Sequence, residues 1–435
     1  MTTQTPELIE IFIEKLLIEK VRHLQNLEIT LSQTERQHLI LTGPNGSGKT
    51  SILNQLKLVL SDLSQESNKN ESISSWLKPD HMSIYEHFFK AKFERLPYFI
   101  QCLKEQQNND KPSELELSTN EFKTLIEEKF KHWGIVISLK SIENMLPKFH
   151  NGEFLLAAFD AKRNLKLELP QGIQQLEFKS NYAIEDSLQK VFLQYLVNLK
   201  ASRSFARDDG DHDTADKIDA WFERFEKLLN DLFEDGPVEL EFDRKQFTFH
   251  LKQANKEPFG FDTLSDGYSS ILSIVSELLL RMESKSLLAY DMQGIVIIDE
   301  IEAHLHLSLQ KKILPFLTTL FPRIQFIVST HSPFVLSSIS NTVIYDLAEQ
   351  EAVHDLTNYS YTSIVESYFE QDQYSQDLKN KLDRYEFLLK QSQLAEAEQI
   401  ELDNLHEELE SAPTLMSPEL ELRLQSLKLK QPTSA

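Results

Sequence analysis

Three glycines of a chain that uses few of them lie in one short loop, just before a lysine and a threonine. Glycine occurs 11 times in 435 residues, yet three copies fall in the stretch LTGPNGSGKTSILNQL. The stretch fits the pattern G-x-x-x-x-G-K-[ST], in which backbone N–H groups converge on phosphate oxygens because no side chains stand in the way. It predicts a nucleotide-binding loop followed by a helix, with the contacts made by Gly43, Pro44, Asn45, Gly46, Ser47, Gly48, Lys49, Thr50 and Ser51.

Lys49 and Thr50 supply the charge and the hydroxyl that phosphate chemistry needs. A lysine in this position reaches the β- and γ-phosphates, and the threonine hydroxyl ligates Mg²⁺. Elsewhere, the apolar stretch GIVII runs into Asp299 and Glu300. Two adjacent carboxylates at the end of a buried strand are costly unless a cation or a water network uses them. We therefore expect Asp299 to hold Mg²⁺ together with Thr50, and Glu300 to orient the attacking water.

Two further segments place polar groups next to apolar elements. In LSDGYSS, Ser265 and Gly267 offer a hydroxyl and an open backbone N–H at the start of a long helix. In FIVSTHS, His331 follows another short apolar run. Taken alone, Ser265 has the character of an ordinary helix cap and His331 that of a structural histidine.

The elements that must position these residues are indicated by hydrophobic patterning. The run at 38–42 and the stretches GIVIIDE and IQFIVSTHS are short and continuously apolar, which predicts strands buried on both faces of a parallel sheet. The stretch IFIEKLLIEKVRHLQNLEITL predicts paired strands ahead of the loop. Two helices with a polar break at 208–213, and a strand hairpin turning near 243–245, are expected before the LSDG segment.

The order of the motifs resembles that of ABC-type ATPases: a P-loop, LSDG, a strand ending in Asp-Glu and a strand ending in Thr-His. LSDGY is similar to the LSGGQ-type signature of that superfamily, and His331 to its switch histidine. IDEIEAHLH is similar to the D-E-P-E-x-H-L-H form of the soluble OLD, RecF and SMC kind. With STHSPFVL, the chain looks like the bacterial AAA-type ATPases of the Septu, PARIS and retron-associated anti-phage systems, over about residues 10–350.

The resemblance implies an α/β fold: a P-loop NTPase of ABC-ATPase type with an N-terminal antiparallel β-layer, an inserted helical lobe and a helical C-terminal tail. It implies ATP and Mg²⁺ as cofactors, with Glu300, His331 and Lys49 catalytic and Thr50 and Asp299 at the metal. We expect the chain to divide into the first part of the ATPase head (1–60), a helical insertion (61–150), a strand with a helical lobe and hairpin (151–250), the rest of the head (251–348) and an acidic helical tail (349–435).

Departures from the family pattern leave some assignments open. Asp266 and Tyr268 stand where the signature usually has a small residue and a glutamine. A Q-loop glutamine is not fixed, since Gln101 sits in helical sequence. Asp160 and Arg163 in AAFDAKR either reach the site from a strand end or form a salt-bridged surface pair.

Two acidic or histidine-rich stretches invite a metal interpretation. His304 and His306 lie beside Glu302, but helix positions two apart do not face each other, and the resemblance accounts for these residues. The stretch DDGDHD lacks the spaced ligands and terminal Glu of a calcium loop, so we interpret it as a solvated turn between helices.

The net charge of −23 argues against general adhesion to nucleic acid, because phosphate binding needs clustered Lys and Arg. From Asp346 onward, 19 acidic and 7 basic residues give −12, so the tail is a compositional unit. The single cysteine, Cys102, excludes an internal disulfide framework. We expect no signal peptide, no membrane contact and a cytoplasmic location. A local basic groove is left open, its candidates being Lys162, Arg163, Lys166, Lys200, Arg203 and Arg207.

In this superfamily the signature of one subunit completes the nucleotide site of another. The resemblance therefore implies ATP sandwiched in a head-to-tail homodimer or a higher oligomer. We expect an ATP-hydrolysing sensor or regulator of a bacterial anti-phage defence complex. No nuclease constellation is visible in the sequence, which predicts a separate effector chain of HNH or toprim type. The acidic tail is either its docking element or a solvated extension.

Two other functions stay open. The first is a RecF- or SMC-like ATPase of DNA repair or chromosome maintenance, for which nucleic acid would be a partner. The second is a nucleotide-dependent scaffold with negligible hydrolysis.

Overall fold

The computed structural model divides into two units, Met1–Tyr359 and Ser360–Ala435. The residues that the structure describes are 9–65, 134–234, 236–283, 291–359, 361, 363–364, 376–391 and 394–410. The short helices expected between Trp76 and Lys131, together with Gln101 and Cys102, lie outside the described residues.

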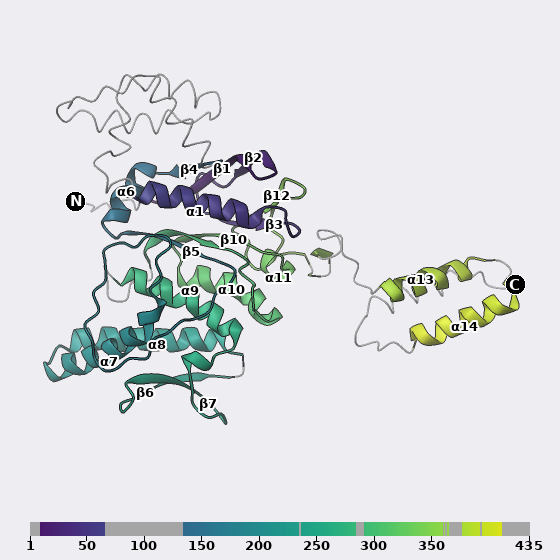
Figure 1. The fold of residues 1–435 in the computed structure, drawn as a ribbon. Helices are drawn as coiled ribbons and strands as arrows, with labels where there is room; N and C mark the ends of the chain where they lie inside the picture. Colours follow the sequence, from purple (N-terminus) through teal and green to yellow (C-terminus); the bar gives the residue numbers. More distant parts are fainter. Residues whose placement is uncertain are drawn as a thin grey trace, which may run out of the picture. The chain divides into compact units, whose positions relative to one another are not determined.

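A six-stranded sheet with the order β12-β11-β3-β10-β9-β5 organises the first unit (Figure 1). Its parallel strands are β5 (Phe154–Phe159), β9 (Gln293–Ile298), β10 (Ile324–Ser329), β3 (His38–Thr42) and β11 (Thr342–Asp346). The edge strand β12 (Glu351–His354) runs antiparallel to β11. Every residue of β3, β9 and β10 is buried, which confirms the prediction that these apolar runs form strands covered on both faces, and the same holds for β11, which was not predicted.

An antiparallel sheet with the order β2-β1-β4 forms the N-terminal layer. It consists of β1 (Phe12–Val21), β2 (Leu24–Thr30) and β4 (Ile135–Lys140). The strand β4 falls within the segment 61–150, which we expected to be helical. Its sequence IVISLK is rich in β-branched residues and pairs with β1, so the tertiary context and the strand propensity agree. Helix α6 (Ile142–His150) follows it.

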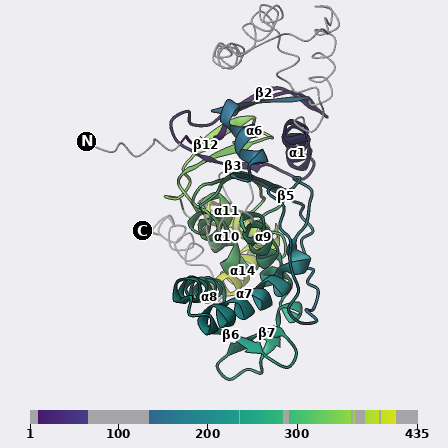
Figure 2. The same cartoon turned by 90° about the vertical axis from the view of Figure 1, so that its left-hand side faces the viewer.

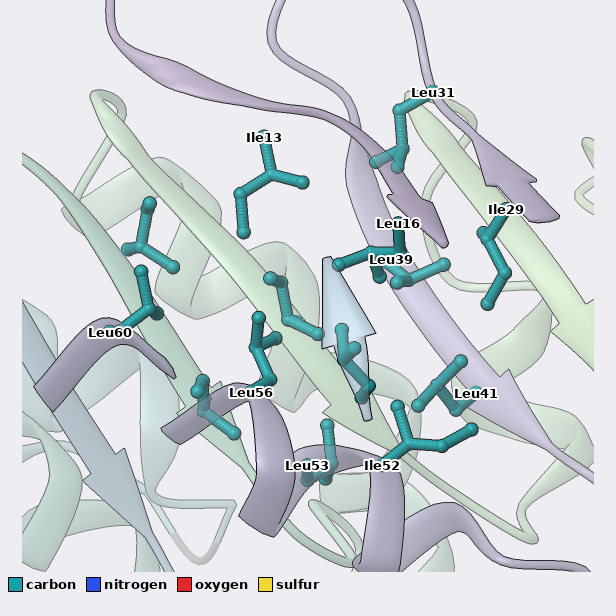
Figure 3. Close-up of a cluster of buried hydrophobic side chains, with 14 of the residues drawn as sticks. Ile13, Leu16, Ile29, Leu31, Leu39, Leu41, Ile52, Leu53, Leu56 and Leu60 are labelled. Carbon is teal, nitrogen blue, oxygen red and sulfur yellow. The ribbon is translucent and has the colours of Figure 1, made fainter. Parts of the chain in front are cut away.

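Helix α1 (Lys49–Gln65) lies between the two sheets and joins them into one core (Figures 1 and 2). Leucine and isoleucine side chains from both sheets meet the apolar face of α1 (Figure 3). Full burial of one such side chain stabilises the fold by roughly 1.5–3 kcal/mol. The core therefore fixes the start of α1, and the loop before it, against β3. The residues labelled in Figure 3 are Ile13, Leu16, Ile29, Leu31, Leu39, Leu41, Ile52, Leu53, Leu56 and Leu60.

Helices cover the other face of the six-stranded sheet (Figures 1 and 2). Next to the sheet lie α9 (Asp266–Met282) and α10 (Leu307–Leu320), and beyond them the lobe helices α7 (Phe192–Asp208) and α8 (His212–Leu232). The Asp211 carboxylate caps α8 by accepting the Thr214 N–H, so the stretch DDGDHD is a turn between helices. The remaining elements are η3 (Gln189–Val191), β6 (Val238–Asp243), β7 (Thr248–Gln253), β8 (Phe259–Gly260), η4 (Phe261–Thr263) and α11 (Pro333–Leu336).

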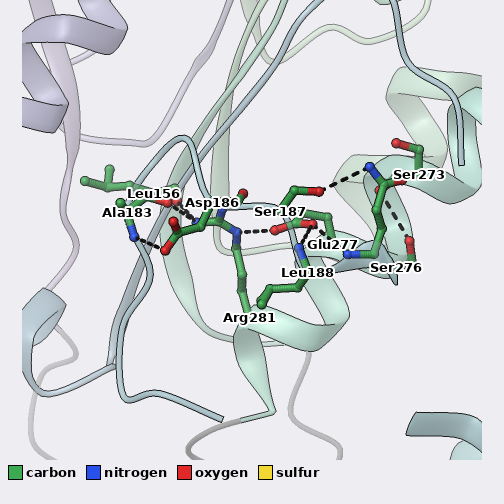
Figure 4. A network of polar contacts seen from close by, with 10 residues as sticks. Leu156, Ala183, Asp186, Ser187, Leu188, Ser273, Ser276, Glu277 and Arg281 are labelled. Carbon is green, nitrogen blue, oxygen red and sulfur yellow. Dashed lines mark hydrogen bonds and ion pairs between the residues drawn. The ribbon is translucent and has the colours of Figure 1, made fainter. Parts of the chain in front are cut away.

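A buried ion pair fastens the irregular segment 160–188 to α9 (Figure 4). Arg281 and Glu277 lie one turn apart on α9, with 3 % and 5 % of their side chains exposed. The guanidinium donates to Glu277 and to the carbonyl oxygens of Leu156, Ala183 and Asp186. The carboxylate accepts the backbone N–H groups of Leu188 and Gln189.

The second unit contains α13 (Gln376–Leu389) and α14 (Glu396–Glu410), as predicted for the helical tail. Leu382, Tyr385 and Leu409 form its buried core. A bidentate contact between Arg384 and Glu401 also joins the helices. Within the parts of the chain that the structure describes, no helix is long and apolar enough to cross a membrane. The predicted fold class is thus confirmed: an α/β head with an antiparallel β-layer, a helical lobe and a helical tail.

Candidate functional site

The predicted site residues come from separate segments but share one edge of the six-stranded sheet. The strands β3, β9, β10 and β5 are parallel, so the residues after each strand meet at the same end. The glycine-rich loop follows β3, and Asp299 with Glu300 follows β9. His331 follows β10, and Arg163 lies just beyond β5.

The loop between β3 and α1 has the backbone that its glycines predict. Gly43 and Gly48 have φ values of 127° and 105°, a region that side-chain-bearing residues avoid. A Cβ on Gly48 would also lie 2.6 Å from Leu24 Cδ1. Lys49 is buried, and its Nζ donates to the carbonyl oxygens of Gly43 (2.8 Å) and Pro44 (3.0 Å). The lysine therefore folds over its own loop.

The loop also offers hydrogen-bond donors that have no acceptor within the described residues, and a phosphate site requires such donors. Ser47 is buried, and its Oγ has no hydrogen-bond partner among the described residues. Residues 44–46 are exposed, and Thr50 and Ser51 stand in the first turn of α1. The first N–H groups of a helix have no acceptor within it, and they carry partial positive charge. This donor set fits the phosphates of a nucleotide.

Asp299 connects the glycine-rich loop to the neighbouring strands. Its Oδ1 accepts hydrogen bonds from Thr50 Oγ1 (3.2 Å) and from Ser329 Oγ (2.5 Å). The structure thus brings together the carboxylate and the hydroxyl expected to share a metal ion. Both are oxygen donors of the kind that Mg²⁺ prefers. Ser329, the last residue of β10, was not among the residues predicted from the sequence.

Glu300 has an unusual backbone conformation. Its φ is +44°, in the left-handed region that non-glycine residues enter at a cost of about 1–3 kcal/mol. The Glu300 N–H donates to Ser329 Oγ at 2.8 Å. Ser329 therefore contacts both acidic residues of the turn after β9, accepting from one and donating to the other.

His331 is paired with a carboxylate that the sequence did not single out as part of the site. The His331 N–H donates to Glu302 Oε1 at 2.5 Å, while Glu302 Oε2 is buried without a partner among the described residues. Burial lowers the pKa of His331, and nearby Lys49 lowers it further, while Glu302 opposes the shift. The neutral imidazole is therefore favoured at neutral pH. His304 and His306 are exposed.

The Lys49 ammonium interacts electrostatically with the carboxylates of Asp299, Glu300 and Glu302. Burial lowers the pKa of Lys49, and the negative charges of Glu302, Glu300 and Asp299 act in the opposite direction. The Lys49 charge and these carboxylates therefore influence one another electrostatically, although Lys49 donates its hydrogen bonds to the carbonyl oxygens of Gly43 and Pro44.

Of the two alternatives left open for Arg163, the structure shows the contact with the site from the end of β5 and not the salt-bridged surface pair. Arg163 is 4 % exposed, and its guanidinium donates to backbone oxygens of the turn after β9 and to Ser270 Oγ on α9. Its contact with Asp160 is to the carbonyl oxygen, at 3.0 Å. Burial lowers the pKa of Arg163 to about 10, so it stays protonated at neutral pH. The pairing of β5 with β9 brings it there, which the sequence alone did not reveal.

The basic side chains proposed for a nucleic-acid groove are mostly engaged within the fold. Arg203 and Arg207 both pair with Asp219. The Lys200 ammonium lies 5.2 Å from the centroid of the Phe222 ring, and Arg163 is buried. Lys162, Lys166 and Arg207 are the exposed members of the set, and of these Arg207 is paired with Asp219.

The LSDGY segment lies at the N-terminus of α9. Ser265 is exposed, and its side chain makes no capping hydrogen bond, so it is not an ordinary helix cap. A Cβ on Gly267 would lie 3.1 Å from the His304 carbonyl oxygen, which shows how closely α9 approaches the turn after β9. Tyr268 stacks on Phe233 with ring centroids 4.2 Å apart. No hydrogen bond joins Ser265 to the glycine-rich loop within the described residues.

Comparisons with known families and proteins agree with this geometry. A family model described as "AAA domain" matches residues 15–234, about half of the chain. A second model, described as "AAA domain, putative AbiEii toxin, Type IV TA system", matches residues 206–337.

The curated relatives are similar at modest identity. The Septu protein PtuA of Bacillus mycoides (strain KBAB4) is 26% identical over 417 residues, which cover 92% of this chain and 50% of that protein. The chain thus spans about half the length of that relative. The Retron Vc95 probable ATPase of Vibrio cholerae serotype O1 biovar El Tor is 21% identical, over 73% of this chain and 70% of that protein. Among solved structures, the SmcHead bound to the C-winged helix domain of ScpA is 15% identical, with a TM-score of 0.35 over 77% of this chain and 94% of that one.

Proposed function

The chain belongs to the AAA domain family, and we propose that it is an ABC-type ATPase that binds ATP with Mg²⁺ and hydrolyses it. One observation carries the proposal: the Thr50 hydroxyl hydrogen-bonds the Asp299 carboxylate beside the buried lysine of a glycine-rich loop, and Glu300 follows at once. This arrangement holds phosphate donors, metal ligands and a general base at one sheet edge.

Each residue has a defined task in this proposal. Lys49 exchanges its two carbonyl acceptors for phosphate oxygens, while Thr50 and Asp299 hold the metal ion. Mg²⁺, when bound, neutralises charge on the β- and γ-phosphates. Glu300 orients a water whose oxygen attacks the γ-phosphorus, and the electron pair of the broken bond leaves with the β-phosphate oxygen. His331, whose neutral form is favoured by burial, hydrogen-bonds the γ-phosphate in this proposal.

We further propose that Ser265 and Gly267 of a second copy close the nucleotide site, in a head-to-tail dimer. The exposed Ser265 hydroxyl and the absence of its hydrogen bonding to the chain's own loop, within the described residues, support this arrangement. Nucleotide then joins two copies, and hydrolysis releases them, because the closed dimer binds ATP more tightly than the open form does.

ATP turnover by three variants tests the proposal. Glu300→Gln removes the base and is expected to lower turnover by about 10²–10⁴-fold while ATP still binds. Lys49→Ala is expected to lose ATP binding itself. Glu239→Gln, the same change at an exposed glutamate on β6, serves as the control and keeps wild-type turnover. Wild-type turnover by Glu300→Gln would refute the catalytic assignment, and unaltered ATP affinity of Lys49→Ala would refute the binding site.

For the biological role, we propose an ATPase regulator of a bacterial anti-phage defence complex, acting in the cytoplasm on a separate effector nuclease of HNH or toprim type. The names of the relatives, a Septu protein and a retron ATPase, support this role. The helical unit after residue 360 is the proposed docking element. The engaged basic side chains do not favour the alternative of a DNA-repair ATPase.

Phage infection tests the role. Cells that carry the gene with its genomic neighbours should resist phage, and the Glu300→Gln variant should not show the wild-type level of resistance, because it no longer hydrolyses ATP at the wild-type rate. Equal plating on cells with and without the wild-type genes would contradict the defence role, and would leave the ATPase assignment standing.

A further inference from the structure

Arg163 uses every N–H group of its guanidinium: three contact the turn after β9, one contacts α9, and one contacts the end of its own strand at Asp160. Nη1 donates to the Asp299 and Asp160 carbonyl oxygens (2.6 and 3.0 Å), and Nη2 to those of Glu300 and Ile301 (2.9 and 3.2 Å). Nε donates to Ser270 Oγ at 3.2 Å. A guanidinium has five donors in a rigid planar fork, so this set of contacts fixes the relative positions of all the acceptors.

The acceptors on the turn explain why Glu300 can keep its strained backbone. Three successive carbonyl oxygens, from Asp299 to Ile301, face a single cation. Without that cation, a left-handed glutamate with φ of +44° would relax toward an ordinary conformation, and its carboxylate would move. Arg163 is therefore a positioning residue for Glu300, and it acts through the backbone.

The remaining acceptor ties the same turn to the helix that begins with the LSDGY segment. Ser270 lies on α9, about one turn after Ser265 and Gly267, and it is 1 % exposed. Gly267 packs against the His304 carbonyl oxygen of the loop that follows the turn, so two contacts link α9 to the acidic residues. A displacement of the N-terminus of α9 is therefore transmitted through these contacts to the backbone of Glu300.

We infer that Arg163 and Ser270 couple the two nucleotide sites of the dimer. When the α9 of one chain contacts the ATP at one site, Arg163 and Ser270 of that chain position its Glu300 at the other site. This inference rests on the proposed head-to-tail dimer, in which a chain gives α9 to one ATP and Glu300 to the other. ATP binding at the first site shifts the N-terminus of α9. Through Ser270, Arg163 transmits this shift to the carbonyl oxygens of residues 299–301, and the Glu300 carboxylate takes its catalytic position at the second site. The two sites then hydrolyse ATP cooperatively.

Two neighbouring serines on α9 allow a matched test. Ser270→Ala removes the hydroxyl that Arg163 contacts. Ser269→Ala removes a hydroxyl from the adjacent position, which accepts the Leu165 N–H at 3.0 Å, whereas the Arg163 Nε donates to Ser270. The measurement is the ATP-concentration dependence of turnover. For two coupled sites we expect a Hill coefficient approaching 2 in the wild type and in Ser269→Ala, and about 1 in Ser270→Ala.

A second variant separates positioning from mere structural support. Arg163→Lys keeps the charge but loses the fork, so it should lower kcat by about 10²-fold or more while KM for ATP changes only a few-fold. A lower unfolding temperature with unchanged kcat would show that Arg163 only stabilises the fold, and would overturn the inference.

The outcomes distinguish this inference from the function on which it rests. Cooperative turnover that survives in Ser270→Ala, or non-cooperative turnover in the wild type, would overturn the coupling and leave the ATPase assignment intact. No turnover in the wild type would overturn both. Loss of cooperativity in Ser270→Ala, with cooperativity kept in Ser269→Ala, is the result that the coupling predicts.

Discussion

Replacing Arg281 by methionine is expected to destabilise the head domain strongly, although its partners among the described residues lie outside the nucleotide site. The substitution keeps an apolar side chain of similar length and removes the cation. It leaves Glu277 buried at 5 % exposure, with only the Leu188 and Gln189 N–H groups as partners. It also removes a donor from three backbone carbonyl oxygens, of which that of Ala183 keeps the Asp186 N–H at 3.1 Å.

The expected loss of unfolding free energy follows from the burial of the ion pair between Arg281 and Glu277. Removal of one partner of a buried ion pair costs about 3–5 kcal/mol, since the other charge stays uncompensated. Each carbonyl oxygen left without a donor adds a cost of about 1–3 kcal/mol, less whatever water recovers. A loss near 5 kcal/mol is a large part of the ~5–15 kcal/mol by which native proteins are stable. We therefore expect Arg281→Met to unfold at a much lower urea concentration than the wild type.

The assay is urea unfolding followed by far-ultraviolet circular dichroism. Lys217→Met is the matched control, because Lys217 forms an ion pair with Asp213 at the same i, i+4 spacing on α8. That pair is exposed, so its loss should leave the transition unchanged. The double variant Glu277→Leu/Arg281→Met should recover part of the stability, since no charge stays buried. A transition of Arg281→Met at the wild-type midpoint would refute this reasoning.

Three further predictions follow from single contacts. Ser329→Ala should lower ATP turnover by about 10–10²-fold with little change in ATP affinity, as single-turnover rates and binding titrations would show. Gly48→Ala should abolish ATP binding in a titration, because its φ of 105° and the 2.6 Å approach of Leu24 exclude a Cβ. Burial raises the pKa of Glu283 from 4.5 to about 7, so the folded protein holds a proton that the unfolded chain releases. Stability measured by thermal unfolding should therefore fall as the pH rises from 4.5 to 7, and Glu283→Gln should remove that fall.

The strands and the glycine-rich loop were predictable because their signals are local. A strand buried on both faces must be apolar at every position, as the stretches before Asp299 and His331 are. Likewise, a phosphate loop needs glycine where the backbone is left-handed, as at Gly48. Requirements of this kind produce a pattern that can be recognised within a few consecutive residues of the sequence.

The residues that were missed act through contacts far apart in the sequence. Arg163 was named only as an alternative, because it lies 136 positions from Asp299 and nothing in AAFDAKR shows that its guanidinium will meet backbone oxygens. Ser329 and Glu302 were hidden for the same reason, since their roles depend on β9 and β10 being neighbours. The strand β4 was missed because its partner, β1, is more than a hundred residues away.

The central claim is that ATP joins two copies of this chain through the LSDGY segment of each. Its most direct test is the mass in solution of the Glu300→Gln protein, measured by light scattering with and without Mg·ATP. The account predicts a gain in mass with ATP, and no gain when Ser265→Arg is added to block the partner's site. An unchanged mass while ATP is bound, or a gain that survives Ser265→Arg, would contradict it.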